Sequence, residues 1–222
     1  MKAGFIGCGN MGGTLAAVAA KSGAAVLIAD HNAEKLEALR SSWGCEPASA
    51  EAVAAECGLI FLGVKPQVVK GAAEEIRGTL HARDDHFAVV SMAAGVTVEA
   101  VSDMLGGVPV IRIMPNTPAA AGEGVILYCL GEGVTEADEA AFLALMAPAG
   151  LCMKLEEPKL DMGSAVTGCG PAFVCLLMEA MTDAGVRLGL PRDKALAFTL
   201  QTFRGTAALA LDRKSTRLNS SH

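Results

Sequence analysis

Short apolar runs alternate with segments of helical periodicity through the first two-thirds of the chain. The apolar runs predict strands at 2–6, 24–29, 58–64, 86–92, 108–114, 124–129 and 150–155. Helical patterns lie between most of them, near 11–22, 33–42, 49–56, 67–80, 97–105 and 135–146. This alternation predicts an α/β fold, a Rossmann-like, doubly wound and mainly parallel sheet with helices on both faces. We expect the last two strands to be antiparallel additions.

After residue 157 the strand pattern stops, and helices are predicted near 158–167, 171–188 and 192–211. In the middle helix the charged residues Glu179, Asp183 and Arg187 are spaced four apart, so they form one narrow stripe on an otherwise apolar surface. About 50 residues cannot bury such a helix alone. We therefore expect a smaller all-helical domain that packs against another copy, with a homodimer as the minimum. The alternative is that it folds back on its own sheet.

The composition turns basic and polar at Lys214. We do not expect the last nine residues to continue the preceding helix, and they resemble read-through from cloning DNA, although a frayed natural terminus is the alternative. The predicted organisation is a dinucleotide-binding Rossmann domain over 1–157, a helical substrate and dimerisation domain over 158–213 that is incomplete, and a non-native tail over 214–222.

Composition and charge exclude several function classes. The net charge is −6 without a basic cluster, which argues against a nucleic-acid partner. A long uncharged stretch, 162–178, is interrupted by glycines and a proline, so we expect no membrane-spanning helix. The first strand begins at once, without room for a signal peptide, which predicts a cytoplasmic protein. The seven cysteines show no CxxC pair and the four histidines are scattered, so we expect reduced thiols and no metal site.

The most informative motif joins the first strand to the first helix. Gly7 permits a tight turn, Gly9 allows backbone N–H groups to approach a pyrophosphate, and Gly12 allows close helix packing. Asp30 ends the next apolar run, close to the roughly 20-residue spacing of a ribose-binding carboxylate. The motif predicts dinucleotide binding. The alternatives are a glycine turn kept only for packing, and an Asp30 that caps the following helix.

Three more loops follow predicted strands at the same edge of the sheet, where doubly wound folds bind ligands. Val64–Pro66 forms a cofactor-facing loop, or else a solvated lysine before a helix-opening proline. The small residues of Ser91–Gly95 leave room for a flat ring, a weak signal by itself. Two prolines fix the backbone around Asn116 and Thr117, which suits rigid hydrogen bonding to a nicotinamide carboxamide.

A glycine-flanked helix start occurs in the helical part, where Pro171 stands at the first helical position. Free N–H groups at Cys169 and Gly170 would hold a substrate carboxylate. The same spacing fits an ordinary helix–helix bend equally well.

Together and in this order, these motifs resemble those of pyrroline-5-carboxylate reductases. The matching segments are Gly7–Gly12, Val64–Pro66, Ala93–Thr97, Met114–Pro118, Gly168–Ala172, Glu179–Met181, Asp183–Val186, Gly189–Arg192 and Gln201–Thr202, and the resemblance covers about residues 2–211. It implies NAD(P)H-dependent reduction of 1-pyrroline-5-carboxylate to L-proline, the last step of proline biosynthesis. A protonated cyclic iminium is already electrophilic, which agrees with the lack of an evident acid–base dyad in the sequence.

The resemblance also implies site residues, by position. The cofactor contacts, including those of the glycine motif, are Ile6, Gly7, Cys8, Gly9, Asn10, Met11, Gly12, Asp30, Ser49, Gly63, Val64, Lys65, Pro66, Met92, Ala93, Ala94, Asn116 and Thr117. Ser49 would touch the adenosine side. Glu157 matches a position near the substrate, beside the turn at Cys169 and Gly170. No catalytic side chain is assigned, because the Ser-Pro-Gly-Gly-Thr-Thr segment that would meet substrate is expected beyond residue 211.

Two departures from the family pattern affect the site. Its usual Ser-Gly-Ser-Gly-Pro-Ala-Tyr reads here as Thr167–Phe173, so Cys169 replaces a hydroxyl and donates hydrogen bonds poorly. Asp30 is followed by His31 where many relatives carry an arginine, and a carboxylate repels a 2′-phosphate, which favours NADH over NADPH.

Two other functions fit part of the sequence pattern. A β-hydroxyacid dehydrogenase-like enzyme shares the glycine-rich opening. Such enzymes carry a catalytic lysine on the helix that follows a later glycine-rich turn, and here no lysine occurs between Gly170-Pro171 and Lys194. A catalytically silent dinucleotide-binding fragment is the second alternative.

Overall fold

The protein, seen in a computed structural model, is described over residues 2–219, with side chains described as far as residue 212. It divides into two compact units, Met1–Gly168 and Cys169–His222. The first holds the sheet and its covering helices, and the second holds two long helices.

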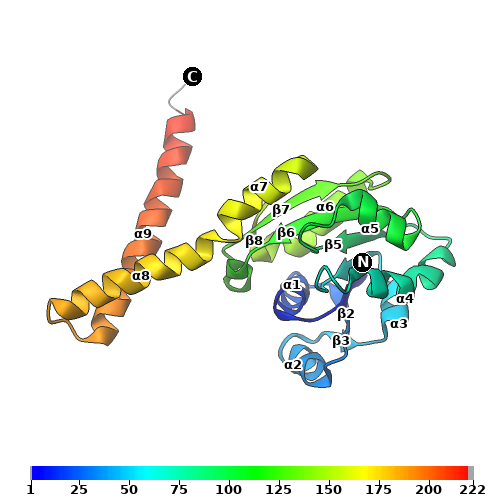
Figure 1. Ribbon diagram of the computed structural model, residues 1–222, viewed down its shortest axis with the longest axis horizontal. Helices are drawn as coiled ribbons and strands as arrows, with labels where there is room; N and C mark the ends of the chain where they lie inside the picture. The colour runs from blue at the N-terminus through cyan, green and yellow to red at the C-terminus, as the bar shows by residue number, and fades with distance from the viewer. Residues whose placement is uncertain (1, 220–222) are drawn as a thin grey trace. The chain divides into compact units, whose positions relative to one another are not determined.

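The first unit is built on one eight-stranded sheet with the order β3-β2-β1-β4-β5-β6-β7-β8 (Figure 1). The strands are β1 Lys2–Ile6, β2 Ala25–Ala29, β3 Glu46–Pro47, β4 Leu59–Leu62, β5 Ala88–Ser91, β6 Val110–Pro115, β7 Gly124–Leu130 and β8 Gly150–Lys154. The strands β1 to β6 are parallel, β7 runs antiparallel to β6, and β8 runs parallel to β7. The predicted fold class and the reversed direction of the last two strands are confirmed.

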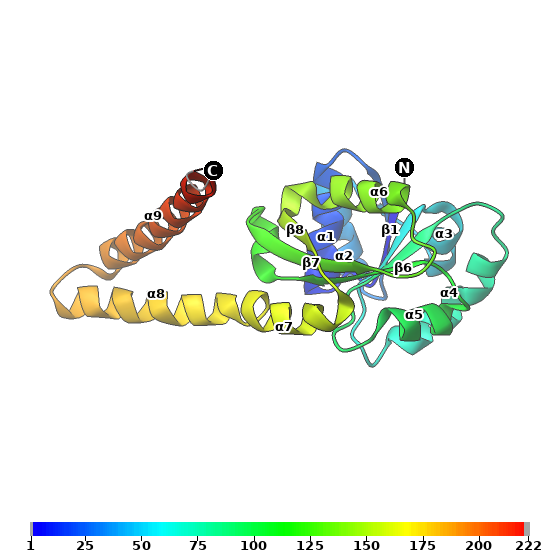
Figure 2. The same cartoon turned by 90° about the horizontal axis from the view of Figure 1, so that it is seen from above.

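Helices cover both faces of this sheet. Those of the first unit are α1 Asn10–Lys21, α2 Ala33–Trp43, α3 Ala50–Glu56, α4 Val69–His81, α5 Val98–Leu105, α6 Glu136–Met146 and α7 Glu157–Thr167, with the 3₁₀ turns η1 Thr117–Ala121 and η2 Ala147–Ala149. Figure 2 shows α1 and α6 on one side of the sheet and α4, α5 and α7 on the other. Buried side chains form one core under each layer, and most of them are aliphatic, with Phe5, Phe61 and Phe142 among the largest.

The strands β2 and β4 are continuous apolar runs because both of their faces are covered. All four residues of β4 and of β5 are buried, and Phe5 of β1 stacks on Phe61 of β4 with ring centroids 4.3 Å apart. Short polar side chains begin several helices, as with Ser49, whose hydroxyl accepts from Ala52 N–H at 3.1 Å. Because the central strands are parallel, their carboxyl ends lie together at one edge of the sheet.

Helix α7 belongs to the sheet unit. Leu160 is fully buried beside Leu127 and Cys129 of β7. The expected domain boundary was residue 157, where the strand pattern stops, whereas the first compact unit continues to Gly168 because α7 packs on β6 and β7.

The second unit consists of α8 Gly170–Arg187 and α9 Arg192–Asn219. Ala195 and Thr199 of α9 are buried, as is Thr182 of α8. The prediction that the tail does not continue the preceding helix is wrong, because α9 runs on to Asn219. Lysine, arginine and leucine are good helix formers, and neither glycine nor proline interrupts them between Lys214 and that residue. The rest of the proposed tail, 220–222, lies outside the described residues.

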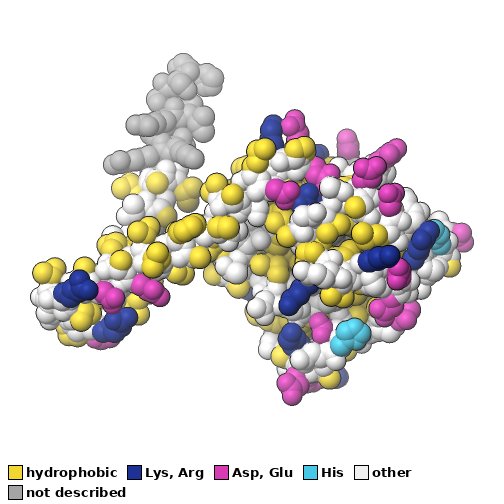
Figure 3. Space-filling view, viewed as in Figure 1, with side chains coloured by type: hydrophobic (Ala, Val, Ile, Leu, Met, Phe, Trp, Pro, Cys, Tyr) yellow, Lys and Arg dark blue, Asp and Glu magenta, His cyan; other side chains and the backbone are white. Residues whose placement is uncertain are grey.

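Large apolar side chains remain exposed on α8. Phe173 is 65% exposed, and Leu176 and Leu177 are also exposed, as the apolar side chains along α8 in Figure 3 illustrate. By length and composition alone, the helical stretch Glu157–Arg187 could cross a membrane, and 6% of its most apolar window is buried. The uncharged residues 162–178 form only part of this stretch, which also includes charged residues at both ends. One such helix is weak support for a membrane, since helices of other kinds meet the same criterion.

Candidate dinucleotide site

The loop between β1 and α1 leaves helix N–H groups without a side-chain cap. Gly7 follows the strand with a positive φ of 89°, a conformation that glycine adopts without strain. Gly9 is the N-cap residue of α1 and has no side chain to accept from the helix N–H groups. These N–H groups and the helix dipole favour an anion at this point. The loop therefore fits a bound pyrophosphate.

Three glycines are required here for close packing, and a fourth is not. A Cβ on Gly12 or on Gly63 would overlap the carbonyl oxygen of Gly7. A Cβ on Gly9 would meet nothing within 4 Å. The alternative of a turn kept only for packing accounts for Gly7, Gly12 and Gly63, but it gives no reason for Gly9. Open space above Gly9 is what a phosphate group needs.

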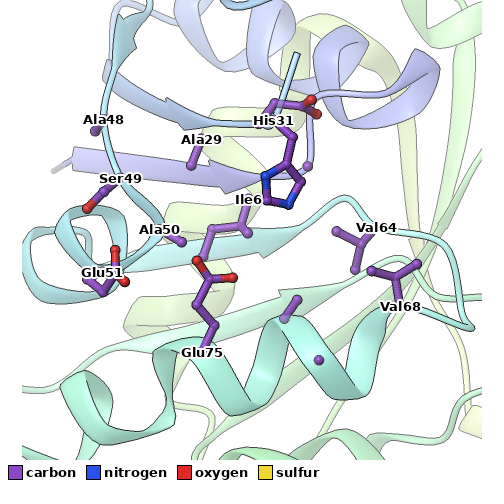
Figure 4. Close-up of a pocket in the computed structure, with 14 residues that line it drawn as sticks. Ile6, Ala29, His31, Ala48, Ser49, Ala50, Glu51, Val64, Val68 and Glu75 are labelled. Atoms are coloured by element: carbon purple, nitrogen blue, oxygen red, sulfur yellow. The ribbon is translucent and has the colours of Figure 1, made fainter. Parts of the chain in front are cut away.

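A cavity of about 380 Å³ opens beside this loop (Figure 4). Its walls come from the ends of β1 and β2, the start of α3, the loop after β4 and one side of α4. The lining residues are Ile6, Gly7, Ala29, Asp30, His31, Ala48, Ser49, Ala50, Glu51, Val64, Val68, Gly71, Ala72 and Glu75. Of the residues expected to bind cofactor, Ile6, Gly7, Asp30, Ser49 and Val64 lie here. The cavity is of a size and polarity that suits an adenosine moiety.

Asp30 connects the end of β2 to the glycine-rich loop. Its Oδ2 accepts from Cys8 N–H at 2.6 Å, and its Oδ1 accepts from Asn32 N–H at 2.8 Å. The alternative that Asp30 caps the following helix is wrong. The cap of α2 is Asn32, whose Oδ1 accepts from Lys35 N–H at 3.1 Å. The Asp30 carboxylate is thus fixed by two backbone donors at the rim of the cavity.

The far wall of the cavity was not anticipated from the sequence. Val68, Gly71, Ala72 and Glu75 come from α4 and the residue before it, and Glu51 comes from the first turn of α3. Small residues at helical spacing indicate only that a helix packs closely on something. No sequence signal distinguished this face of α4 from one that packs against the core.

The proline-bracketed loop after β6 is held by its asparagine. Asn116 is 8% exposed, its Nδ2 donates to the Thr167 carbonyl at 2.9 Å, and its Oδ1 accepts from Val125 N–H at 2.8 Å. This side chain therefore ties the end of β6 to β7 and to the end of α7. Thr117 is exposed at the start of η1. Any polar contact of this loop to a ligand falls mainly to Thr117 and to backbone groups.

The loops after β4 and β5 also lie at this edge of the sheet. Lys65 and Pro66 are exposed in a turn closed by Val68 N–H donating to the Lys65 carbonyl at 2.8 Å. Met92 is partly buried and Ala93 is buried immediately after β5. Asn10 and Met11 belong to the first turn of α1. The structure thus gathers the residues predicted in the first unit, from Ile6 to Thr117, at the carboxyl ends of the parallel strands.

Glu157 serves an ion-pair network. Its Oε1 accepts from Arg112 at 3.2 Å and from Val98 N–H at the start of α5 at 2.7 Å. Arg112 also donates to Asp161 at 2.6 Å, and its guanidinium is 2% exposed. Arg112 is not among the residues predicted from the sequence, although a lone charge inside a buried strand needs partners and was a usable signal. The side chain of Glu157 therefore joins β6, α5 and α7.

The cysteines differ in their surroundings. Burial, assisted by the nearby Asp30, raises the pKa of the Cys8 thiol to about 12, and burial raises the pKa values of Cys57 and Cys129 to about 11. Cys169 is exposed next to Gly170 at the start of α8, in the second unit. Among the described residues, no group of three or more His, Cys, Asp or Glu side chains is arranged to hold a metal ion.

Two family models match the chain. Residues 2–95 match the model described as NADP oxidoreductase, coenzyme F420-dependent. Residues 157–220 match the model described as pyrroline-5-carboxylate reductase dimerisation. The first match contains the glycine-rich loop and the cavity, and the second begins with α7.

Individual relatives agree with both matches. Pyrroline-5-carboxylate reductase of Arabidopsis thaliana is 36% identical over 213 residues, which cover 94% of this chain and 76% of that protein. A solved structure of a Coxiella burnetii pyrroline-5-carboxylate reductase matches with a TM-score of 0.86 and 28% identity, covering 95% of this chain and 79% of that one. The Plasmodium falciparum enzyme, solved with NADP bound, matches with a TM-score of 0.82 and 27% identity, covering 94% and 78%. This chain therefore belongs to the pyrroline-5-carboxylate reductase family.

Proposed function

We propose that the chain is an oxidoreductase that uses NAD(P)H to reduce the C=N bond of 1-pyrroline-5-carboxylate, which yields L-proline. The observation that carries this proposal is the family relationship, 36% identity over 94% of the chain, in a fold whose strand ends carry a glycine-rich anion loop. When bound, NAD(P)H supplies the hydride. The chain's task is then to bind, orient and exclude water, which accounts for much of the rate in such reactions.

Different groups of residues bind different parts of the cofactor. The cavity bounded by Asp30 and Ser49 takes the adenosine half, and the uncapped N–H groups near Gly9 take the pyrophosphate. The nicotinamide half then extends toward Met92–Ala94 and Thr117, along the ends of β5 and β6. Asn116 contributes by fixing this loop through its two hydrogen bonds.

The substrate and a second copy of the chain would both bind to the helical part. The start of α8, at Cys169 and Gly170, presents N–H groups suited to a substrate carboxylate. Exposed Phe173, Leu176 and Leu177 give α8 an apolar surface that a second copy of the chain would cover, in accord with the dimerisation model that matches 157–220. We keep the division into 1–157, 158–213 and 214–222 as the functional organisation, with a cytoplasmic location and without a nucleic-acid or membrane partner.

The direct test is proline formation by the purified chain. We expect 1-pyrroline-5-carboxylate and NADH or NADPH to give proline by chromatography, matched by the fall in absorbance of the reduced cofactor. Cofactor binding without proline formation would favour the silent dinucleotide-binding fragment. Oxidation of 3-hydroxy acids without activity on the cyclic imine would favour the β-hydroxyacid dehydrogenase alternative. Sedimentation as a monomer at micromolar concentration would contradict the homodimer.

A further inference from the structure

The cavity beside the glycine-rich loop is lined by one sign of charge. Asp30, Glu51 and Glu75 contribute three carboxylates, and His31 is the one side chain among its lining residues that can carry a positive charge. Figure 4 shows Glu75 extending from α4 toward Ala50 and the His31 ring directed toward Ile6. An anionic group placed in this cavity would therefore meet like charge from α4 as well as from the end of β2.

The Asp30 carboxylate is placed to accept further hydrogen bonds and to reject a phosphate. Each of its oxygens accepts one backbone N–H, from Cys8 and from Asn32, and each keeps a lone pair for another donor. A ribose 2′-hydroxyl has a proton to donate to it. A 2′-phosphate carries close to two negative charges at neutral pH, so it offers Asp30 repulsion in place of a hydrogen bond.

The positive side chains of α2 do not offset this field. Lys35 stands in the first turn of α2 with an exposed side chain, and it is not among the lining residues. Arg40 lies further along the same helix and approaches Glu37 at 3.7 Å. Exposed cations of this kind are strongly screened by water and salt. Neither gives the fixed, forked contact by which an arginine recognises a phosphate.

We propose that this chain selects NADH over NADPH, with Asp30 as the residue that sets the preference and Glu75 adding to it from the opposite wall. The proposal rests on the proposed function and specifies its cofactor. It separates this chain from the matching family model, which is described as an NADP oxidoreductase, and from the Plasmodium falciparum relative solved with NADP. Selection here works by repulsion of the wrong ligand more than by extra contacts to the right one.

The first test uses the unmodified chain and two cofactor fragments, ADP-ribose and 2′-phospho-ADP-ribose, with affinities measured by calorimetry. We expect the phosphorylated fragment to bind at least about tenfold more weakly. We also expect the ratio to narrow at high salt, because the discrimination is electrostatic. Equal or tighter binding of the phosphorylated fragment would overturn the proposal, as would failure of both fragments to bind. Neither fragment reacts, so the result does not depend on reductase activity.

The second test assigns the preference to Asp30. Asp30→Asn keeps one oxygen acceptor and removes the charge, so we expect the affinity ratio to move toward the phosphorylated fragment by about tenfold. The double change Asp30→Ser with His31→Arg should move it further. Glu37→Gln removes a charge from the exposed face of α2, outside the cavity, and should leave the ratio unchanged.

Damage to the loop would be recognisable in these variants. Because Asp30 also holds Cys8 N–H, a loosened loop would weaken both fragments together and leave their ratio as it was. An unchanged ratio in Asp30→Asn, with affinity for ADP-ribose retained, would show that Asp30 does not set the preference. An equal shift in Glu37→Gln would attribute the effect to net charge and contradict the proposal in the same way.

Discussion

Alanine substitutions at Gly9 and at Gly12 distinguish a glycine that is needed for ligand binding from a glycine that is needed for packing. Gly9 has φ −64° and ψ −169°, extended backbone that alanine also adopts, and its added Cβ would meet nothing within 4 Å. At Gly12, by contrast, the added Cβ would overlap the Gly7 carbonyl oxygen, which belongs to the backbone and cannot rotate away. The two substitutions are therefore chemically identical and structurally opposite.

The expected magnitudes follow from these surroundings. For Gly9→Ala, reduced entropy of the unfolded chain stabilises by about 0.4–1 kcal/mol and a poorer N-cap costs about as much, so stability stays within about 1 kcal/mol. For Gly12→Ala, overpacking costs about 3 kcal/mol and the better helix propensity of alanine offsets about 1 kcal/mol. At about 2–4 °C per kcal/mol, Tm should fall by about 4–8 °C in Gly12→Ala and change by less than about 4 °C in Gly9→Ala.

Cofactor affinity, unlike stability, should depend on Gly9. In Gly9→Ala the methyl group stands where a pyrophosphate would approach, and loss of one charge-assisted hydrogen bond weakens NADH binding by about 10–100-fold. The assay is thermal unfolding of the cofactor-free chain together with a fluorescence titration of NADH. A Gly9→Ala variant that melts normally and binds NADH as tightly as the parent would refute the assignment of this loop to the pyrophosphate.

Three further predictions concern the rest of the sheet unit. Glu157→Ala should lower the free energy of unfolding, measured by urea unfolding, by about 2 kcal/mol, because Arg112 stays buried with one partner fewer. Asp161→Ala removes an exposed carboxylate and should cost less than about 1 kcal/mol. Equal losses in the two variants would contradict this ranking. Burial raises the pKa of Asp138, but hydrogen bonds from His86 and from Thr135, the N-cap residue of α6, outweigh burial and hold that pKa below 3.8. The contribution of Asp138 to stability is therefore present above about pH 4 and is lost as pH falls through the lowered pKa. The deficit of Asp138→Asn should therefore vanish in acid, and a constant deficit in urea unfolding across pH would refute the linkage. Burial raises the pKa of Cys8 to about 12, so this thiol should react with a disulfide reagent at about pH 8 only on unfolding, and rapid labelling of the native chain at Cys8, located by peptide mapping, would contradict its placement.

The element order was predictable because local signals agreed. The strands β2 and β4 are uninterrupted apolar runs, and polar caps such as Ser49 and Thr97 mark the starts of helices. Strand β3, Glu46–Pro47, escaped prediction because two residues carry no periodicity. The continuation of α9 to Asn219 escaped it because a change of composition was interpreted as a change of structure.

The candidate site was predictable where backbone geometry imposes a residue type. Gly7 needs a positive φ and Gly12 needs close approach, so both show in the sequence as glycine. The role of Asn116 could not be predicted, because a side-chain amide can bind a ligand or a neighbouring carbonyl equally well. Only the fold brings Thr167 next to Asn116. Glu75 likewise reaches the cavity through the packing of α4, which sequence spacing does not encode.

The most direct measurement is a crystal structure of the chain with NADH bound. We predict that the pyrophosphate lies over Gly9 at the start of α1, that the adenosine ribose donates to Asp30, and that the nicotinamide ring lies beside Met92–Ala94 and Thr117. Clear density for the dinucleotide at another edge of the sheet, with the glycine-rich loop free of phosphate, would contradict it.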